Sequence, residues 1–306
     1  MAESARTLRF GPYAVELSNP DKVYFPDAGI TKGDVVEYYR RIAEVMLPHL
    51  AGRPLTLQRF PDGIGEDGFF QQARPDYVPE FVGEVRAARV GGGEIDHVVV
   101  ENTAALVYLA DQGAITFHGW MARQDRLDRP DRLIVDLDPP DGGFDAVRQA
   151  ARWVGDLLRE LGFTPFLMTT GSRGLHVVAP LDGTGRFDDV RAFARDAAEV
   201  LAKRHPDALT TEQRKDARDG RVYLDVMRNA YGQTAVMPYS LRSKPGAPVA
   251  TPLDWHELGD GDLDAQRYTL GNLFRRLGQK DDPWSGMQRR AKGIEAARSS
   301  LAALGA

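Results

Sequence analysis

The sequence contains no cysteine among its 306 residues. Disulfide bonds and thiolate-bound metal ions are therefore excluded, and a reducing compartment is permitted. An excess of basic charge is also lacking, because 39 lysine and arginine residues face 44 aspartate and glutamate residues and the formal net charge is −5. A nucleic-acid partner would therefore have to be met by a local basic groove, since the chain has no general coat of positive charge.

Long apolar runs are missing as well. No stretch reaches the length that spans a bilayer, and residues 1–6 lack the apolar core of a signal peptide. The chain has no G-x-G-x-x-G or Walker loop, which argues against a doubly wound nucleotide-binding fold, and no G-x-S-x-G nucleophile elbow. We expect a cytoplasmic protein without a membrane partner.

The apolar pattern predicts alternating strands and helices in an α/β (α+β) fold. Helices are expected at 32–46 (capped by Thr31), 103–112, 144–161, 187–204 and 287–303, and strands at 7–17, 55–60, 97–100, 115–120, 133–138, 165–170, 175–179, 222–226 and 233–238. The short turn at 171–174 requires a hairpin, so the predicted sheet is mixed. Residues 1–282 are expected to form one domain, and 283–306 a helical appendage.

The most informative segment is a predicted buried strand that ends in Asp136 and Asp138. Side chains two residues apart in a strand point to the same face, and two like charges at that distance repel unless a cation or a proton intervenes. Divalent ions that handle phosphates are commonly held by such carboxylate pairs. Alternatively, Asp138 only caps a turn before Pro139 while Asp136 faces solvent, and the tripeptide alone supports both interpretations equally.

A third carboxylate, Asp225, interrupts another apolar run. A carboxylate inside a strand is costly unless it is paired or coordinated, so Asp225 is a candidate third ligand of a two-metal site. The alternative is that Asp225 lies at the end of a strand, harmlessly exposed at the surface.

Candidate phosphate-binding groups follow in the segment 169–176, which offers the Ser172 hydroxyl, the Arg173 guanidinium and the His176 imidazole. These groups suit a triphosphate, although the segment alone is more typical of an ordinary glycine-containing hairpin. Arg242 is either a further phosphate-binding group or a charge at the rim. His118 lies in an apolar strand, where a single histidine is more often a core residue.

Several residues are candidates for contact with a nucleic acid. Lys22 and Lys32 bracket a turn and could meet one phosphate together, although surface lysines are usually only solvated. Of Phe69 and Phe70, one is expected in the core and the other is a candidate platform for stacking on a base. A basic stretch at 214–221 is a candidate for gripping a nucleic-acid backbone.

Taken in order, four separated motifs (Asp-Leu-Asp-Pro, Gly-Ser-Arg-Gly-Leu-His, the strand Asp225, and Pro-Tyr-Ser-Leu-Arg) resemble those of the polymerase domain of bacterial ligase D. That domain is a branch of the archaeo-eukaryotic primase–polymerase superfamily. The resemblance covers roughly residues 8–282, and it implies a primase–polymerase-like core with mixed, largely antiparallel sheets flanked by helices.

The resemblance also implies an activity and its residues. It implies template-dependent nucleotidyl transfer in short gap filling, with a preference for ribonucleotides and with two divalent ions, Mn²⁺ or Mg²⁺. Its implied partners are gapped or broken DNA with a 5′-phosphate, with Ku and a separate DNA ligase as further candidates, in the bacterial cytoplasm at the nucleoid. The implied metal ligands are Asp136, Asp138 and Asp225; the implied nucleotide contacts are Ser172, Arg173, His176, Arg242 and His118; the implied DNA contacts are Asn19, Lys22, Lys32, Phe69, Phe70 and Arg218.

The chain departs from ligase D in having no K-x-D-G ligase nucleophile and no room for ligase or nuclease domains. Two other functions remain alternatives. One is a phosphohydrolase with Asp136 as nucleophile, although Pro139 stands where such enzymes usually carry a small hydroxyl residue soon after the second aspartate. The other is a non-catalytic module that bridges DNA ends, in which the lysines matter and the aspartates do not.

Overall fold

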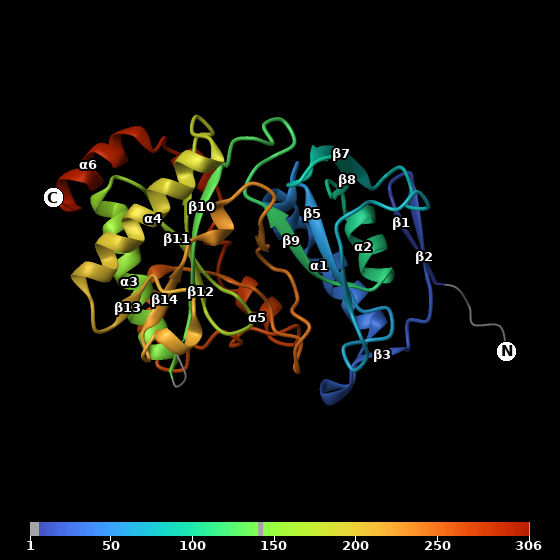
Figure 1. Ribbon diagram of the computed structural model, residues 1–306. Helices are drawn as coiled ribbons and strands as arrows, with labels where there is room; N and C mark the ends of the chain where they lie inside the picture. The colour runs from blue at the N-terminus through green and yellow to red at the C-terminus, as the bar shows by residue number, and fades with distance from the viewer. Residues whose placement is uncertain (1–5, 140–142, 306) are drawn as a thin grey trace. The chain divides into compact units, whose positions relative to one another are not determined.

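The structure, a computed structural model, describes residues 6–139 and 143–305 (Figure 1). The chain divides into two compact units, each built from separate stretches of sequence. The first unit comprises 1–125, 234–250 and 268–276, and the second comprises 126–233, 251–267 and 277–306. Within the described residues, no helix is both long enough and apolar enough to cross a membrane.

The first unit holds a sheet in the order β15-β9-β5-β8-β7, with β6 paired to β5, and two small pairs, β1-β2 and β3-β4. Every pairing in this unit is antiparallel. Its strands are β1 (Arg6–Phe10), β2 (Tyr13–Leu17), β3 (Val23–Phe25), β4 (Ile30–Thr31), β5 (Leu55–Arg59), β6 (Phe69–Gln71), β7 (Gly83–Ala88), β8 (Glu94–Val99), β9 (Ala114–Trp120) and β15 (Thr234–Val236).

Two helices of the first unit, α1 (Lys32–Leu50) and α2 (Thr103–Asp111), pack against each other. Helix α1 begins where the sequence predicts, because Thr31 and Asp34 form a reciprocal capping box. It continues four residues beyond its predicted end, since its apolar stripe extends to the buried Leu50. The unit also contains the 3₁₀ turn η1 (Pro26–Ala28) and most of the short helix α5 (Leu273–Leu277).

The second unit is built on a six-stranded sheet in the order β13-β14-β10-β12-β11-β16. Only the β13–β14 pair is parallel, so the sheet is mixed and largely antiparallel, as expected. The strands are β10 (Arg132–Asp138), β11 (Phe166–Thr169), β12 (Leu175–Pro180), β13 (Leu209–Thr210), β14 (Val222–Asp225) and β16 (Pro252–Leu253); the helices are α3 (Phe144–Glu160), α4 (Phe187–Arg204) and α6 (Glu295–Gly305); the 3₁₀ turns are η2 (Lys215–Ala217), η3 (Met227–Asn229), η4 (Trp255–Gly259) and η5 (Met287–Arg290).

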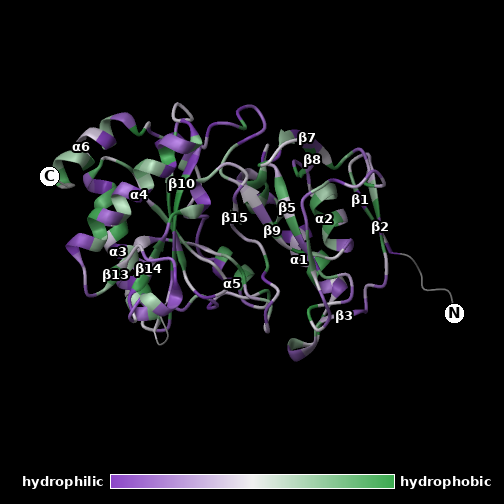
Figure 2. Ribbon diagram, in the orientation of Figure 1, coloured by the Kyte–Doolittle hydropathy of each residue, from purple (hydrophilic) through white to green (hydrophobic). Residues whose placement is uncertain are grey.

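Alternation along β10 decides which residues face the helices. Strand β10 is largely hydrophobic (Figure 2), and Leu133 and Val135 line an apolar core with side chains of α3 and α4. Because successive strand residues point to opposite faces, Asp136 and Asp138 lie on the face away from that core. The helices therefore stabilise one face of the sheet and leave the other available for polar groups.

The C-terminal segment differs from the single helix expected at 287–303. It forms η5, then α6, with Gly293 between them, and a side chain at Gly293 would lie 2.6 Å from the Glu295 carboxylate. The segment is attached to its unit, because the Trp284 indole N–H donates to the Leu167 carbonyl at 2.9 Å and Leu181 forms a bridge with Lys292. The described part of this segment thus packs on the second unit.

Candidate functional site

A row of polar side chains crosses the second unit's sheet at Asp136. In the antiparallel register, Asp136 lies directly opposite Asp225 on β14 and directly opposite His176 on β12. Directly opposed residues point to the same face with Cβ atoms about 5 Å apart. Asp138, two residues along β10, shares that face. Three strands therefore bring together the three predicted carboxylates and His176, which is predicted to contact the nucleotide.

The electrostatics of this row are unfavourable for the carboxylates. Partial loss of hydration and the negative charge of Asp136 raise the pKa of Asp138, and Asp225 contributes in the same direction. Arg173 and His176 oppose this shift without cancelling it. The Asp136 carboxylate has cationic or polar neighbours on two sides, with His176 Nε2 at 3.4 Å and Arg228 Nε at 3.8 Å. Together the carboxylates of Asp136, Asp138 and Asp225 keep an excess of negative charge, which favours binding of a cation.

Two contacts downstream of β14 hold this arrangement. The Asp225 carboxylate accepts a hydrogen bond from the Met227 backbone N–H at 2.8 Å. The fully buried Asn229 side chain pairs with the Ile134 backbone, accepting from its N–H at 2.9 Å and donating to its carbonyl at 2.7 Å. Sequence reasoning missed Asn229 and Arg228. The signal in the sequence that could have identified them is their position as a polar pair shortly after a strand that ends in a carboxylate, Asp225.

The hairpin between β11 and β12 packs directly on the end of β10. A Cβ atom at Gly174 would lie 1.8 Å from the Leu137 carbonyl oxygen, so only glycine fits there. The turn is organised by Thr170, whose hydroxyl accepts from the backbone N–H groups of Ser172 (3.3 Å) and Gly174 (3.2 Å). Gly174 therefore allows the close approach of the neighbouring strand, and this contact fixes the hairpin beside Asp136 and Asp138.

The hairpin also presents the predicted phosphate-binding side chains. Arg173 is exposed, and its guanidinium donates to the Pro139 carbonyl at 3.2 Å, directly after Asp138. His176 is buried, and its Nδ1 atom has no hydrogen-bond partner within the described residues. Ser172 is half-buried, and its carbonyl accepts from the Gln266 side chain at 2.8 Å. Arg173 and His176 therefore lie next to the carboxylate row.

The carboxylate row offers the kind of oxygen donors that bind a divalent cation. Among the described residues, no three His, Asp or Glu side chains are already gathered into an ion-binding group. The three aspartates nevertheless share one face of two neighbouring strands, and partial burial together with the charges of Asp136 and Asp225 raises the pKa of Asp138. Hard divalent ions prefer carboxylate oxygens and relieve such repulsion. The chemistry of these residues therefore suits a divalent ion, and the assignment of Asp136, Asp138 and Asp225 as its ligands stays a prediction.

Metal affinity at this row is expected to depend on pH. A carboxyl whose pKa is raised keeps its proton to a higher pH, and a protonated carboxyl is a poor ligand. We expect Mn²⁺ affinity, measured by calorimetry, to fall as the pH is lowered from neutral toward the raised pKa of Asp138, and Asp138→Asn to lose most of that dependence. An affinity that is constant from pH 7.5 to 5 would contradict this expectation.

The first unit carries the remaining predicted nucleotide contacts, Arg242 and His118. Arg242 follows a segment fastened by Tyr39, whose hydroxyl accepts from the Leu241 N–H at 3.0 Å. The backbone N–H of Arg242 donates to the Pro248 carbonyl at 2.8 Å. His118, on β9, meets the Phe70 ring edge-on with centroids 5.8 Å apart. The roles of Arg242 and His118 stay predictions.

Phe69 and Phe70 differ from the expectation that one of them is in the core. Both are exposed, at 47% and 62%, because β5 is the one described strand with which β6 pairs. The Arg59 guanidinium lies 5.4 Å from the Phe69 ring centroid. The two rings and this cation form a surface suited to stacking on unpaired bases.

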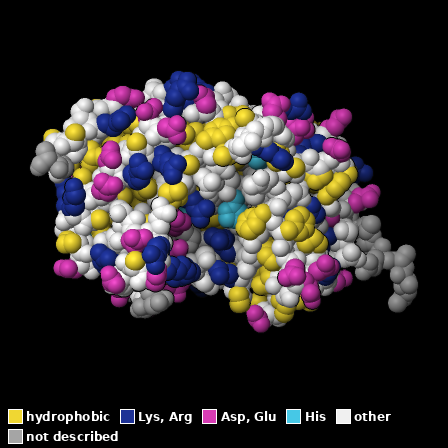
Figure 3. Space-filling model, in the orientation of Figure 1, with side chains coloured by type: hydrophobic (Ala, Val, Ile, Leu, Met, Phe, Trp, Pro, Cys, Tyr) yellow, Lys and Arg dark blue, Asp and Glu magenta, His cyan; other side chains and the backbone are white. Residues whose placement is uncertain are grey.

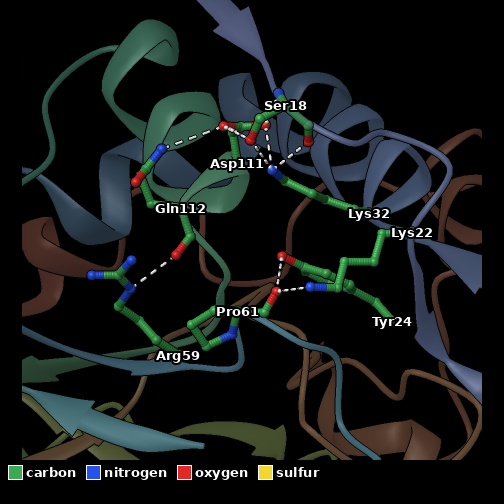
Figure 4. A network of polar contacts seen from close by, with 8 residues as sticks. All are labelled: Ser18, Lys22, Tyr24, Lys32, Arg59, Pro61, Asp111 and Gln112. Carbon is green, nitrogen blue, oxygen red and sulfur yellow. Dashed lines mark hydrogen bonds and ion pairs between the residues drawn. The ribbon is translucent and has the colours of Figure 1, made fainter. Parts of the chain in front are cut away.

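The predicted phosphate-binding lysines have different environments (Figure 4). Lys22 is partly exposed, and its ammonium contacts the Asp62 carboxylate and the Pro61 carbonyl. Lys32 is buried, and its ammonium pairs with Asp111 at 2.8 Å. Asn19 is exposed, with a φ of 47°. Asn19 and Lys22 are accessible to a ligand, whereas Lys32 is already engaged.

Arg218 lies on the second unit. Its guanidinium stacks on Tyr223 at 4.2 Å and donates to the carbonyls of Glu212 (3.1 Å) and Gln213 (2.7 Å). Tyr223 is directly opposite Asp138 in the sheet. A residue that sequence reasoning missed, Tyr223, thus links the Arg218 loop with the carboxylate face.

Basic side chains do not dominate the face of the molecule in view. Lysine and arginine side chains alternate there with aspartate and glutamate (Figure 3). This distribution agrees with the net charge of −5. Any contact with nucleic acid must therefore depend on local groups such as those described above.

Comparison with known proteins identifies the family. The model of the LigD primase–polymerase domain matches residues 31–284. The chain is 34% identical over 277 residues to the "Multifunctional non-homologous end joining protein LigD" of Mycobacterium bovis, covering 88% of this chain and 36% of that protein. It is 34% identical over 286 residues to the protein of the same name in Pseudomonas aeruginosa, covering 92% of this chain and 34% of that protein. The chain thus spans about a third of the length of these relatives.

A solved structure agrees with the sequence comparisons. The polymerase domain from Mycobacterium tuberculosis ligase D, in complex with DNA, matches with a TM-score of 0.85 and 31% identity, covering 90% of this chain and 99% of that one. The resemblance noted in the motifs, and the mixed α+β fold that it implies, are confirmed. This chain therefore belongs to the LigD primase–polymerase domain family.

Proposed function

We propose that this protein is a template-dependent nucleotidyltransferase that extends primers and fills short gaps in broken DNA, with a preference for ribonucleotides. The observation that carries the proposal is the row on the second unit's sheet, where Asp136, Asp138 and Asp225 share a face beside Arg173 and His176. Membership of the LigD primase–polymerase family supports polymerisation over the other uses of such a row.

The three aspartates would hold two divalent ions, Mn²⁺ or Mg²⁺. When bound, such ions supply Lewis-acid activation of the attacking hydroxyl and neutralise charge on the leaving pyrophosphate. The chain's own residues bind and orient the triphosphate. Arg173 and His176 offer a charged fork and an imidazole next to the carboxylates, and charge-assisted bonds to phosphate oxygens are the strong ones. Ser172, Arg242 and His118 are proposed as further nucleotide contacts.

The DNA substrate is proposed to be a gap or a broken end with a 5′-phosphate. The turn that carries Asn19 and Lys22, together with Lys32, is proposed to recognise that phosphate. Phe69 and Phe70 would stack on the template, and both rings are exposed. Arg218 would contact a 3′ overhang. Its guanidinium stacks on Tyr223 and donates hydrogen bonds to two backbone carbonyls, and these contacts fix its position.

The cellular setting is proposed from the relatives. Several bear the name non-homologous end joining protein, and the matching region makes up 36% of one of them and 34% of another. We propose that the protein acts in the bacterial cytoplasm at the nucleoid, with Ku and a separate DNA ligase as partners.

The test is primer extension on a gapped duplex, comparing a 5′-phosphate with a 5′-hydroxyl at the downstream end. We expect templated addition that requires Mn²⁺ or Mg²⁺, is faster with ribonucleotides, and is stimulated by the phosphate. Phosphate release from simple monoesters without incorporation would support a phosphohydrolase instead. Binding that depends on the 5′-phosphate, with no incorporation under either metal, would support a bridging module.

A further inference from the structure

Lys32 and Asp111 form an almost completely buried ion pair in the first unit (Figure 4). The Lys32 Nζ atom lies 2.8 Å from Asp111 Oδ1, and the side chains are only 5% and 2% exposed. Lys32 also donates to the hydroxyl of Ser18 at 2.7 Å and to its carbonyl oxygen. The three protons of the ammonium thus have three acceptors, so Lys32 is fully engaged.

Helix stability does not explain this pair. Lys32 is the first residue of α1, where the helix dipole disfavours a cation, and Asp111 is the last residue of α2, where the dipole disfavours an anion. Burying each ion also costs several kcal/mol before pairing. Apolar residues often stabilise such a site as well as an ion pair does. The pair is therefore better explained by what it positions.

Asp111 positions the turn formed by residues 18–22. Its carboxylate accepts from the Ser18 backbone N–H at 3.0 Å and from the Ser18 hydroxyl at 3.3 Å. From there the backbone of the turn is fastened to the start of α1, because Lys32 N–H donates to the Lys22 carbonyl and Gly33 N–H to the Pro20 carbonyl, both at 2.8 Å. The buried Asp111 is thus connected, through Ser18, to the exposed turn at 18–22.

That turn carries the accessible polar groups. Asn19 is exposed in a left-handed conformation with a φ of 47°, and its carbonyl accepts from the Lys22 N–H at 3.1 Å. The conformation is uncommon outside glycine and must be maintained by its surroundings. If the Ser18 tether is lost, the geometry of Asn19 and Lys22 is expected to relax.

We propose that Asp111 is a positioning residue for recognition of the DNA 5′-phosphate: through its contacts with Ser18 and with the buried Lys32 it fixes the turn at 18–22, so that the phosphate meets Asn19 and Lys22 in a preformed geometry. This inference rests on the proposed function. Removing Asp111 should therefore weaken phosphate recognition. Counting charges alone predicts the opposite, because loss of an acid near a phosphate site would strengthen anion binding.

The experiment measures the affinity of a recessed duplex with a 5′-phosphate and of the same duplex with a 5′-hydroxyl, without nucleotide. The dissociation constant for the 5′-hydroxyl duplex divided by that for the 5′-phosphate duplex gives a ratio that reports phosphate recognition independently of catalysis. Asp111→Asn is expected to lower the wild-type ratio at least fivefold while leaving the affinity for the 5′-hydroxyl duplex within about twofold. Asp62→Asn is the matched control, because it removes an equal charge from the exposed acid that contacts Lys22. Its ratio is expected to be unchanged or higher.

A second variant separates positioning from folding. Lys32→Met combined with Asp111→Leu replaces the ion pair by apolar groups, and we expect it to fold with a Tm near that of the wild type while its ratio stays low. An Asp111→Asn ratio equal to or above that of Asp62→Asn would overturn the positioning role, as would a full ratio in the double variant. A wild-type ratio near one would instead refute the proposed recognition of the 5′-phosphate itself, and the positioning role with it.

Discussion

Asp138→Asn is expected to lower the rate of nucleotide addition by about a thousandfold. The substitution keeps the shape of the side chain and removes one ligand charge from the row formed with Asp136 and Asp225. Ions held by such a row supply several kcal/mol of transition-state stabilisation, and each 1.4 kcal/mol corresponds to a factor of about ten in rate. The rate is measured by single-turnover extension at saturating Mn²⁺.

The same variant is expected to be at least as thermostable as the wild type in the absence of metal. Partial burial and the like charges of Asp136 and Asp225 raise the pKa of Asp138, so its ionised form costs stability at neutral pH, and the asparagine relieves that cost. Asp262→Asn, which removes an exposed carboxylate elsewhere in the second unit, is the control and should change neither property. Retained extension by folded Asp138→Asn at saturating Mn²⁺ would remove Asp138 from the metal ligands.

Gly174→Ala is expected to lower the free energy of unfolding of the second unit by about 3 kcal/mol. The added Cβ would lie 1.8 Å from the Leu137 carbonyl oxygen, so backbone must move. Overpacking costs are about 1–3 kcal/mol, and the upper end applies because no flexible side chain is available to yield. The expected fall in Tm, measured calorimetrically, is about 6 °C or more.

The activity of Gly174→Ala is expected to fall further than its stability explains. Leu137 lies between Asp136 and Asp138, so displacing its carbonyl changes the spacing of the carboxylate row. Extension should therefore be reduced even at temperatures where the variant is fully folded. Gly261→Ala is the matched control, because a Cβ at this exposed glycine meets no atom within 4 Å. Equal Tm values for the two variants would mean that the hairpin does not pack on β10 as described.

Much of the site was predictable because its signals are local. The spacing of Asp136 and Asp138 places both carboxylates on one face of any strand, and the fold confirms the strand. Thr31 predicts the start of α1 for the same reason, since a helix cap is a local signal, and the structure adds Asp34 as the second member of a capping box. The pairing of Asp225 with Asp136 was weaker as a prediction, because register between distant strands depends on the whole sheet.

Other features could not be predicted because they depend on long-range packing. The partner of Lys32 is the last residue of another helix, and rules for single helices argue against a cation at one position and an anion at the other. The exposure of both Phe69 and Phe70 follows from the single neighbour of β6, which no local pattern specifies. Asn229 acts on the Ile134 backbone, a contact visible only after the sheet has formed.

The division of the chain between its two units has a practical consequence for protein engineering. The boundaries at 125/126, 233/234, 250/251, 267/268 and 276/277 mean that the chain passes from one unit to the other five times. Neither unit can therefore be expressed as an uninterrupted fragment, and a protease that cuts once between units leaves four covalent connections intact. Limited digestion should accordingly yield a nicked protein whose pieces separate only under denaturing conditions.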